Sequence, residues 1–186
     1  MIDTLLRFRP YFKQPKIWTE LELCEKKYIV LTLHRPGNVD HVNQLKNLLE
    51  EIIRNSKGLP IIFPVHPRTA EVLKKFDLKS INLFLIEPLG YLEFNYLVER
   101  AKVVITDSGG ITEETTVMGV PCMTLRSNTE RPETIILGTN ELLGTNPSAI
   151  APAMKKIFKN QWKKGGIPEL WDGKTGKRII NLLLNL

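Results

Sequence analysis

The sequence predicts a doubly wound α/β fold, Rossmann-like, in which helices cover both faces of one parallel sheet. Short apolar runs rich in β-branched residues alternate with helical patterns from residue 27 onward. Each run is nearly continuous in apolar character, which is typical of strands that are buried on both faces of a parallel sheet. Alternation of strands and helices at this spacing implies right-handed crossovers between parallel strands.

The elements can be placed in order along the chain. Five strands are expected at residues 27–34, 60–66, 82–88, 101–107 and 121–126, and a short sixth near Thr139–Leu143. Helices are expected at residues 40–55, 68–76, 91–100, 110–119 and 146–160. In the first of these helices the leucines and isoleucines recur at spacings of three and four, and Asp40 is well placed as the N-cap.

The two ends of the chain differ from the alternating region at 27–172. Residues 1–26 form an amphipathic lead, punctuated by prolines, with no strand of its own. Residues 173–186 predict a very apolar final helix whose leucines cover more than one face. We therefore expect this helix to pack against something outside the sheet, as in a piece of a larger protein.

Composition and charge exclude several classes of function. The chain has 186 residues, 42% of them hydrophobic and 25% charged, which is ordinary for a globular domain. It contains no apolar run of about 18 residues and no secretory signal, so we expect no membrane partner. The net charge of +6 comes from dispersed lysines, and the aromatic residues of the densest basic region, 155–178, are widely spaced. This favours a phosphorylated small molecule over nucleic acid as the ligand.

The cysteines point to neither a metal site nor a redox site. Cys24 and Cys122 lie far apart and match no zinc or thioredoxin-type spacing. We expect them to be single, buried or half-buried thiols in the reducing cytoplasm. The sequence predicts no metal and no cofactor.

Polar residues gather in the loops that follow the strands. In an open α/β sheet, ligands bind beyond the carboxyl ends of the strands, where the strand order reverses. The five loops at these ends read His34 to Asn38, His66 to Arg68, Glu87 to Tyr91, Asp107 to Gly110 and Arg126 to Glu133. Histidines, arginines, acids and glycines therefore converge on one edge.

The turn Ser108, Gly109, Gly110 is the best candidate for an anion site. Its glycines permit close approach to the backbone, and the free amides of the following helix point outward. A plain capping turn without a ligand is the simpler alternative. The turn is neither a GxGxxG nor a Walker sequence, which argues against NAD and against ATP hydrolysis.

Glu113 and Glu114 follow in what we expect to be the first turn of that helix. Acids there favour the helix dipole without any ligand. Neighbouring helical positions point about 100° apart, so at most one of the two faces a ligand, and the other is solvated or caps the helix. A carboxylate that faces a nucleotide would suit the ribose hydroxyls. His34 is either structural or a group that titrates near neutrality.

These motifs resemble the carboxyl-terminal domain of the non-hydrolysing UDP-N-acetylglucosamine 2-epimerases, two-domain enzymes of the glycosyltransferase-B type of fold. The resemblance covers roughly residues 27–180 and rests on blocks that occur in the family order: YIVLTLHRPGNVD, IIFPVHPR, EPLGYLEFNYLV, VVITDSGGITEETTVMGVPCMTLRSNTERPET, GTNELLGT and WDGKTGKRI. The lead at 2–6, IDTLL, resembles the linker from the first domain. The resemblance implies that this chain is the second half of such an enzyme, that the amino-terminal domain is its partner, and that the full enzyme is a cytoplasmic homodimer.

The resemblance also assigns roles to the site residues. Ser108, Gly109 and Gly110 would hold the diphosphate, and Arg131 would pair with phosphate. Glu114, rather than Glu113, would take the ribose hydroxyls. Leu89 and Phe94 would border the uracil.

Three further residues lie at positions that the resemblance links to catalysis or regulation. His34 would sit near the diphosphate and assist its departure. Arg35 and His66 would touch a second, allosteric UDP-sugar. Many bacterial members have a glutamate where this chain has Gly37, so the allosteric role depends on whether the site survives that change.

The reaction implied is inversion at C2 of UDP-GlcNAc by anti elimination of UDP and its re-addition, which gives UDP-ManNAc for cell-surface polysaccharides. The family's proton-transferring carboxylates belong to the other domain, so this chain alone is expected to bind UDP and to have no activity. Two alternatives stay open: the nucleotide-sugar half of a glycosyltransferase with the same fold, and a non-enzymatic module that senses nucleotide sugars.

Overall fold

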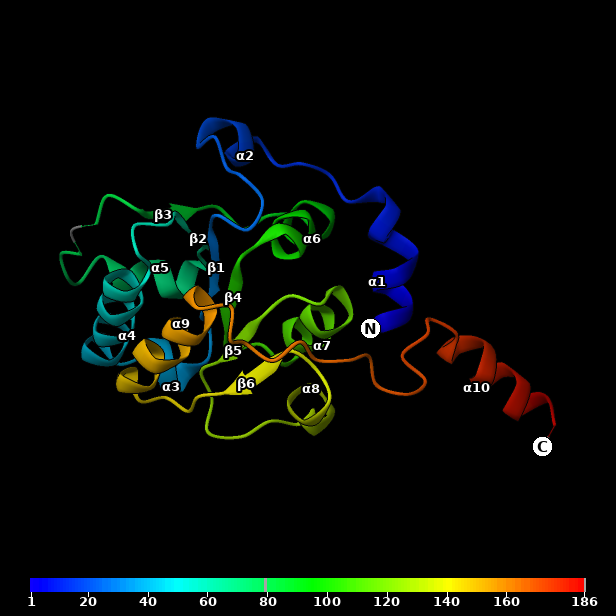
Figure 1. The fold of residues 1–186 in the computed structure, drawn as a ribbon. Helices are drawn as coiled ribbons and strands as arrows, with labels where there is room; N and C mark the ends of the chain where they lie inside the picture. The colour runs from blue at the N-terminus through cyan, green and yellow to red at the C-terminus, as the bar shows by residue number, and fades with distance from the viewer. Residues whose placement is uncertain (79, 186) are drawn as a thin grey trace.

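The computed structural model describes residues 1–78 and 80–185 and confirms a doubly wound parallel sheet (Figure 1). The sheet has six strands in the order β3-β2-β1-β4-β5-β6, and every neighbouring pair is parallel. The strands are β1 (Ile29–Thr32), β2 (Ile61–Pro64), β3 (Leu83–Ile86), β4 (Val103–Thr106), β5 (Cys122–Thr124) and β6 (Asn140–Leu142). All six lie inside the ranges that the sequence predicts.

The helices also follow the predicted pattern. They are α1 (Ile2–Phe8), α2 (Lys16–Glu20), α3 (Pro36–Val39), α4 (Val42–Asn55), α5 (Pro67–Leu73), α6 (Tyr91–Arg100), α7 (Gly109–Met118), α8 (Pro132–Ile136), α9 (Ile150–Phe158) and α10 (Thr175–Leu184), with short 3-10 turns η1 (Arg9–Tyr11) and η2 (Pro147–Ala149). Asp40 is not the N-cap of α4, because a separate short helix, α3, fills the loop before it. The N-cap is His41, and Asp40 pairs with Arg68 at 2.6 Å.

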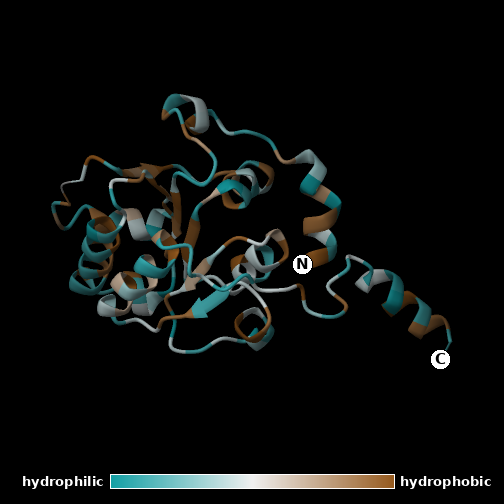
Figure 2. Ribbon diagram, in the orientation of Figure 1, coloured by the Kyte–Doolittle hydropathy of each residue, from teal (hydrophilic) through white to brown (hydrophobic). Residues whose placement is uncertain are grey.

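Alternate residues of the strands build the two halves of the core. Ile29 and Leu31 of β1 face the layer of α3, α4, α5 and α9, whereas Tyr28 and Val30 face the layer of α2, α6 and α7. The central strands are apolar on both faces, as Figure 2 shows by their colour. This burial on both faces explains why the strands read as nearly continuous apolar runs.

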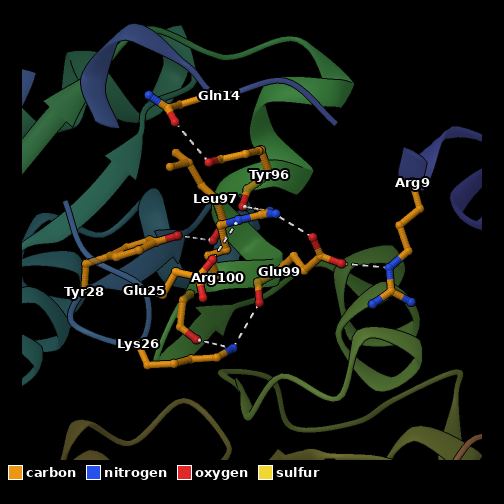
Figure 3. A network of polar contacts seen from close by, with 10 residues as sticks. Arg9, Gln14, Glu25, Lys26, Tyr28, Tyr96, Leu97, Glu99 and Arg100 are labelled. Carbon is orange, nitrogen blue, oxygen red and sulfur yellow. Dashed lines mark hydrogen bonds and ion pairs between the residues drawn. The ribbon is translucent and has the colours of Figure 1, made fainter. Parts of the chain in front are cut away.

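The lead at residues 1–26 is fixed to the domain by specific contacts. Ile2 and Leu5 of α1 are buried with Val117 of α7. Further along, a network of polar contacts connects the segment from Arg9 to Tyr28 with α6 (Figure 3). In it Arg9 pairs with Glu99 at 2.7 Å, and the hydroxyl of the buried Tyr28 donates to the carbonyl of Leu97 at 2.5 Å. The role of the lead as a linker to another domain stays a prediction.

The final helix has its apolar side chains exposed. None of the residues described in α10 is buried, and Ile179, Ile180 and Leu182 to Leu184 are exposed. It leaves the body of the domain beside α1 (Figure 1), where the Asp3 carboxylate accepts a hydrogen bond from the Gly176 amide at 2.9 Å. Leu186, the last residue of the predicted helical segment, lies outside the described residues.

Two remaining expectations concern the thiols and the membrane. Both cysteines are free, but Cys24 is exposed, so its predicted burial was wrong. It lies in the turn before β1, whereas Cys122 lies inside β5 and is buried. Within the described residues no helix is long and apolar enough to cross a bilayer.

Candidate functional site

The polar loops meet where the order of the strands reverses. β1 and β4 are neighbours in the middle of the sheet, with Thr32 opposite Thr106. The chain leaves β1 toward the layer that contains α3 and α4, and leaves β4 toward the layer that contains α7. A crevice opens between diverging connections of this kind, and it is the usual ligand site of doubly wound sheets.

Asp107, directly after β4, organises this point. Its fully buried carboxylate accepts hydrogen bonds from the backbone amides of His34, at 3.1 Å, and Arg35, at 2.9 Å, and from the side-chain amide of Asn38, at 3.1 Å. Burial by itself would raise the pKa of Asp107. The hydrogen bonds from His34, Asn38 and Arg35 outweigh it and hold this pKa below its ordinary value. Asp107 is therefore a buried anion that joins the loop after β1 to the loop after β4.

The same carboxylate orients the imidazole of His34. Nδ1 of His34 lies 2.9 Å from Oδ1 of Asp107, and the His34 side chain is 48% exposed. Because a carboxylate only accepts hydrogen bonds, it keeps the hydrogen on Nδ1. Nε2 of His34 is then the nitrogen that is available to a ligand at the rim.

The turn after Asp107 presents free donors to the crevice. Ser108 is the N-cap of α7, yet its hydroxyl makes no capping hydrogen bond. The first amides of α7, beginning at Gly109 and Gly110, have no partner within the helix, and the helix dipole adds positive potential there. A side chain at Gly110 would collide with Met1, whose Cε lies 2.8 Å from an added Cβ. The arrangement suits an anion.

Glu113 does not have the role that the sequence suggests. The helix starts at Gly109, so Glu113 and Glu114 stand in its second turn rather than its first. Glu113 is only 8% exposed, so it is not solvated, and its carboxylate forms a short ion pair with Nε of Arg131. The pair fixes Arg131, the N-cap of α8, beside α7. Sequence reasoning failed here because the fold buries this face of α7 under the segment before α8.

Glu114 points to a different neighbour, as the angular offset of adjacent helical residues requires. It is 6% exposed, and its Oε1 accepts a hydrogen bond of 2.9 Å from the hydroxyl of Tyr91, the first residue of α6. Burial raises the pKa of Glu114, and the Tyr91 hydrogen bond opposes that rise.

Leu89 and Phe94 lie on the same side of the sheet as α7. Both are half-buried and pack, together with Ile111, against the core layer formed by α6 and β4. Their apolar surface lies close to the end of α6 that carries Tyr91. A planar base could pack against this surface.

Arg35 and His66 have structural roles in the loops that carry them. Arg35 is the N-cap of α3, and His66 is the N-cap of α5, where its Nδ1 accepts a hydrogen bond from the Arg68 amide at 3.3 Å. Both side chains are exposed at the edge where parallel β1 and β2 end. Nothing lies within 4 Å of a Cβ added at Gly37, so a Cβ would meet no obstacle at this position.

Four residues at this edge were not selected from the sequence. Asp107 and Asn38 form the buried hydrogen-bonded group, Tyr91 holds Glu114, and Nη1 of Arg126 lies 3.7 Å from a Cβ added at Gly109. An aspartate directly after a central strand was the available signal for Asp107. Among the described residues no group of three or more histidines, cysteines or acids is arranged to hold a metal ion.

The fold defines a Rossmann-like domain of the glycosyltransferase-B type, and the candidate site lies at the switch point of its sheet. More particularly, the chain belongs to the UDP-N-acetylglucosamine 2-epimerase family, whose sequence model matches residues 1–184.

Relatives and solved structures of that family match the chain over most of its length. A UDP-N-acetylglucosamine 2-epimerase of Methanocaldococcus jannaschii is 43% identical over 170 residues, which are 87% of this chain and 45% of that protein. The crystal structure of the M. jannaschii UDP-GlcNAc 2-epimerase in complex with UDP-GlcNAc and UDP superposes with a TM-score of 0.80 and 37% identity, over 100% of this chain and 53% of that one. The Neisseria meningitidis enzyme bound to UDP-GlcNAc gives a TM-score of 0.82 at 27% identity, over 100% of this chain and 53% of that one. The chain thus spans about half the length of the relatives that it matches.

Proposed function

We propose that this chain is the UDP-binding half of an enzyme that interconverts UDP-GlcNAc and UDP-ManNAc. The observation that carries the proposal is the turn Ser108, Gly109, Gly110 at the start of α7, whose N-cap hydroxyl makes no capping hydrogen bond, with His34 paired to Asp107 at the end of the same strand. The family match and the UDP and UDP-GlcNAc complexes of similar structures support the identity of the ligand.

The ligand is proposed to lie across the crevice with its parts in a fixed order. The amides of Gly109 and Gly110 and the hydroxyl of Ser108 bind the diphosphate, and Arg131 adds a guanidinium. Glu114 accepts hydrogen bonds from the ribose hydroxyls. The uracil lies against Leu89 and Phe94.

The reaction that we propose is an elimination followed by an addition. A base removes the proton from C2 of the sugar while the C1–O bond breaks, and UDP departs with the electron pair to leave a 2-acetamidoglucal. Re-addition of UDP to C1, with protonation of C2 on the opposite face, gives the other epimer. His34, as an imidazolium that keeps its Nδ1 hydrogen on Asp107, donates through Nε2 to the departing diphosphate, and the amides of α7 stabilise the charge of that diphosphate.

We propose that the groups which exchange the C2 proton come from a second, amino-terminal domain, and that the complete enzyme is a cytoplasmic homodimer serving cell-surface polysaccharide synthesis. α10 is proposed to pack on that domain, because its apolar side chains are exposed here. Arg35 and His66 remain proposed contacts of an allosteric UDP-sugar, since both are exposed at the carboxyl edge.

The test is calorimetric titration of the 186-residue chain with UDP, followed by a coupled assay for UDP-ManNAc. We expect saturable binding of UDP and weaker binding of ADP. We expect no turnover unless the proposed amino-terminal domain is also present. Turnover by this chain alone would contradict the proposal that a second domain supplies the groups that exchange the C2 proton. Equal affinity for ADP and UDP would contradict the assignment of Leu89 and Phe94 to the uracil.

A further inference from the structure

Glu114 is a buried carboxylate that forms no ion pair with another side chain among the contacts described. Arg131 pairs through Nε with the preceding residue, Glu113. Glu114 instead accepts a hydrogen bond of 2.9 Å from the neutral hydroxyl of Tyr91, and the side chain of Asn95 is a second neutral donor to it. Two adjacent acids on one helix therefore have different partners: Glu113 forms an ion pair, whereas Glu114 accepts a hydrogen bond from a neutral donor.

This hydrogen bond does not use all of the acceptor capacity of Glu114. Tyr91 donates to Oε1, and a carboxylate has about four acceptor sites on its two oxygens, so it can also accept hydrogen bonds from hydroxyl groups of a ligand. Burial and the adjacent Glu114 raise the pKa of Tyr91, so its hydroxyl retains its hydrogen at neutral pH and stays a donor. Tyr91 is the first residue of α6, which is anchored in the core by Asn95, Leu97 and Val98.

We propose that Tyr91 is a positioning residue that holds the Glu114 carboxylate charged and turned toward the ribose, and that it thereby sets the selectivity of the site for ribonucleotides over 2′-deoxyribonucleotides. This inference rests on the proposed function, since it concerns the same nucleotide. Tyr91 acts through Glu114.

The pH dependence follows from the groups that surround Glu114. Burial raises the pKa of this carboxyl; the Tyr91 hydroxyl lowers it, Glu113 on the same helix raises it, and Asn95 of α6 and the terminal amino group of Met1 lower it. Replacing Tyr91 with phenylalanine removes a hydrogen bond that favours the charged form, so the pKa must rise further. A protonated Glu114 accepts hydrogen bonds from hydroxyls more weakly, so nucleotide affinity must fall as the pH falls.

The test compares Tyr91→Phe with the parent and with Tyr96→Phe. Tyr96 is a matched control, because it lies on the same helix and its hydroxyl also makes one hydrogen bond, to Gln14 at 3.1 Å, away from Glu114. Affinities for UDP and 2′-deoxy-UDP are measured by calorimetry from pH 5.5 to pH 8.5. For Tyr91→Phe we expect the preference for UDP to shrink roughly three- to tenfold, the equivalent of one hydrogen bond, with the largest loss at the acid end. Tyr96→Phe should follow the parent.

A second measurement does not require any ligand. The carboxyl carbon signal of Glu114 is titrated by NMR in the unliganded parent and in Tyr91→Phe. An upward shift of the midpoint in the variant is expected, and an unchanged midpoint overturns the inference whether or not UDP binds. If the parent fails to bind UDP, the proposed function is wrong. The NMR titration still tests whether Tyr91 lowers the pKa of Glu114. If UDP binds, and the preference for ribose and the pH profile of Tyr91→Phe match the parent, the positioning role is wrong.

Discussion

Asp107 links two loops that are far apart in the sequence. Its carboxylate receives the amides after β1, and the Asn38 side chain continues the link to the carbonyl of Leu125, at 2.9 Å, after β5. The loops at the ends of β1, β4 and β5 are thus joined through one buried anion. The side-chain oxygen of Asn38 is buried and has no partner among the described residues, so the group has one acceptor left over.

We predict that Asp107→Asn destabilises the domain by about 2–4 kcal/mol. The carboxylate accepts hydrogen bonds only, whereas the asparagine side chain would place its own NH₂ group against the N–H donors that surround this position. Urea denaturation followed by circular dichroism measures the change in the free energy of unfolding. Asp172→Asn is the matched control, since Asp172 pairs with Arg178 on the surface. Equal losses of unfolding free energy in the two variants would mean that the buried hydrogen bonds of Asp107 stabilise the fold no more than a surface ion pair does.

The lowered pKa of Asp107 also predicts how stability depends on pH. A carboxyl whose pKa is lower in the folded state stabilises the fold above its unfolded pKa, and this contribution is lost as the pH falls through the folded value. The parent should therefore lose stability as the pH falls below the ordinary aspartate value of 3.8. The difference in unfolding free energy between the parent and Asp107→Asn should narrow over the same range, and a constant difference would contradict the assignment.

At the scale of elements, hydrogen bonds and ring contacts join the lead to α6. Tyr28 is fully buried just before β1, and its hydroxyl reaches the carbonyl of Leu97 in α6 (Figure 3). The ring also packs edge-on against Trp18 of α2, with centroids 5.6 Å apart. α6 carries Tyr91 at its other end, so the lead supports the helix on which the Tyr91 hydroxyl depends.

Tyr28→Phe is predicted to lower the free energy of unfolding by about 1–2 kcal/mol, because it leaves the Leu97 carbonyl without its buried donor. Tyr11→Phe serves as the control, since Tyr11 is 67% exposed. Thermal denaturation of the three proteins compares them directly. A Tyr28→Phe protein as stable as the Tyr11→Phe protein would show that the network in Figure 3 is energetically neutral.

α10 and α4 should differ strongly in protection from hydrogen exchange. α4 buries Leu45, Leu48, Leu49 and Ile52, whereas α10 buries none of its described residues. A helix of this length without tertiary packing is marginal in water. In the isolated chain the amides of α10 should exchange far faster than those of α4. Comparable protection would mean that α10 is stable without the second domain that we propose as its partner.

Across the whole molecule, the sequence predicted the fold better than the details of the site. The strands were predictable because burial on both faces of a parallel sheet leaves continuous apolar runs. The pairing of Glu113 with Arg131 was not, because the two residues are eighteen positions apart and meet only through the packing of the segment before α8 on α7. The same holds for Tyr91 and Glu114, which come from different helices.

The pairing of Glu113 changes what the two glutamates predict for binding. In the site that we propose, Glu113 would act on the diphosphate through its ion pair with Arg131, whereas Glu114 would act on the ribose. Loss of either glutamate should therefore weaken the binding of UDP. Only the loss of Glu114 should weaken the binding of uridine, because uridine has no phosphate. The comparison of these ligands separates the two ends of the crevice.

The most direct test of a UDP site at the switch point is titration of the parent, Glu113→Gln and Glu114→Gln with UDP and with uridine. We expect Glu114→Gln to lose about tenfold or more for both ligands, as for a hydrogen bond to a charged acceptor. Glu113→Gln should lose affinity for UDP while it binds uridine like the parent. Equal effects of the two substitutions on both ligands, or no binding of UDP by the parent, would contradict the account.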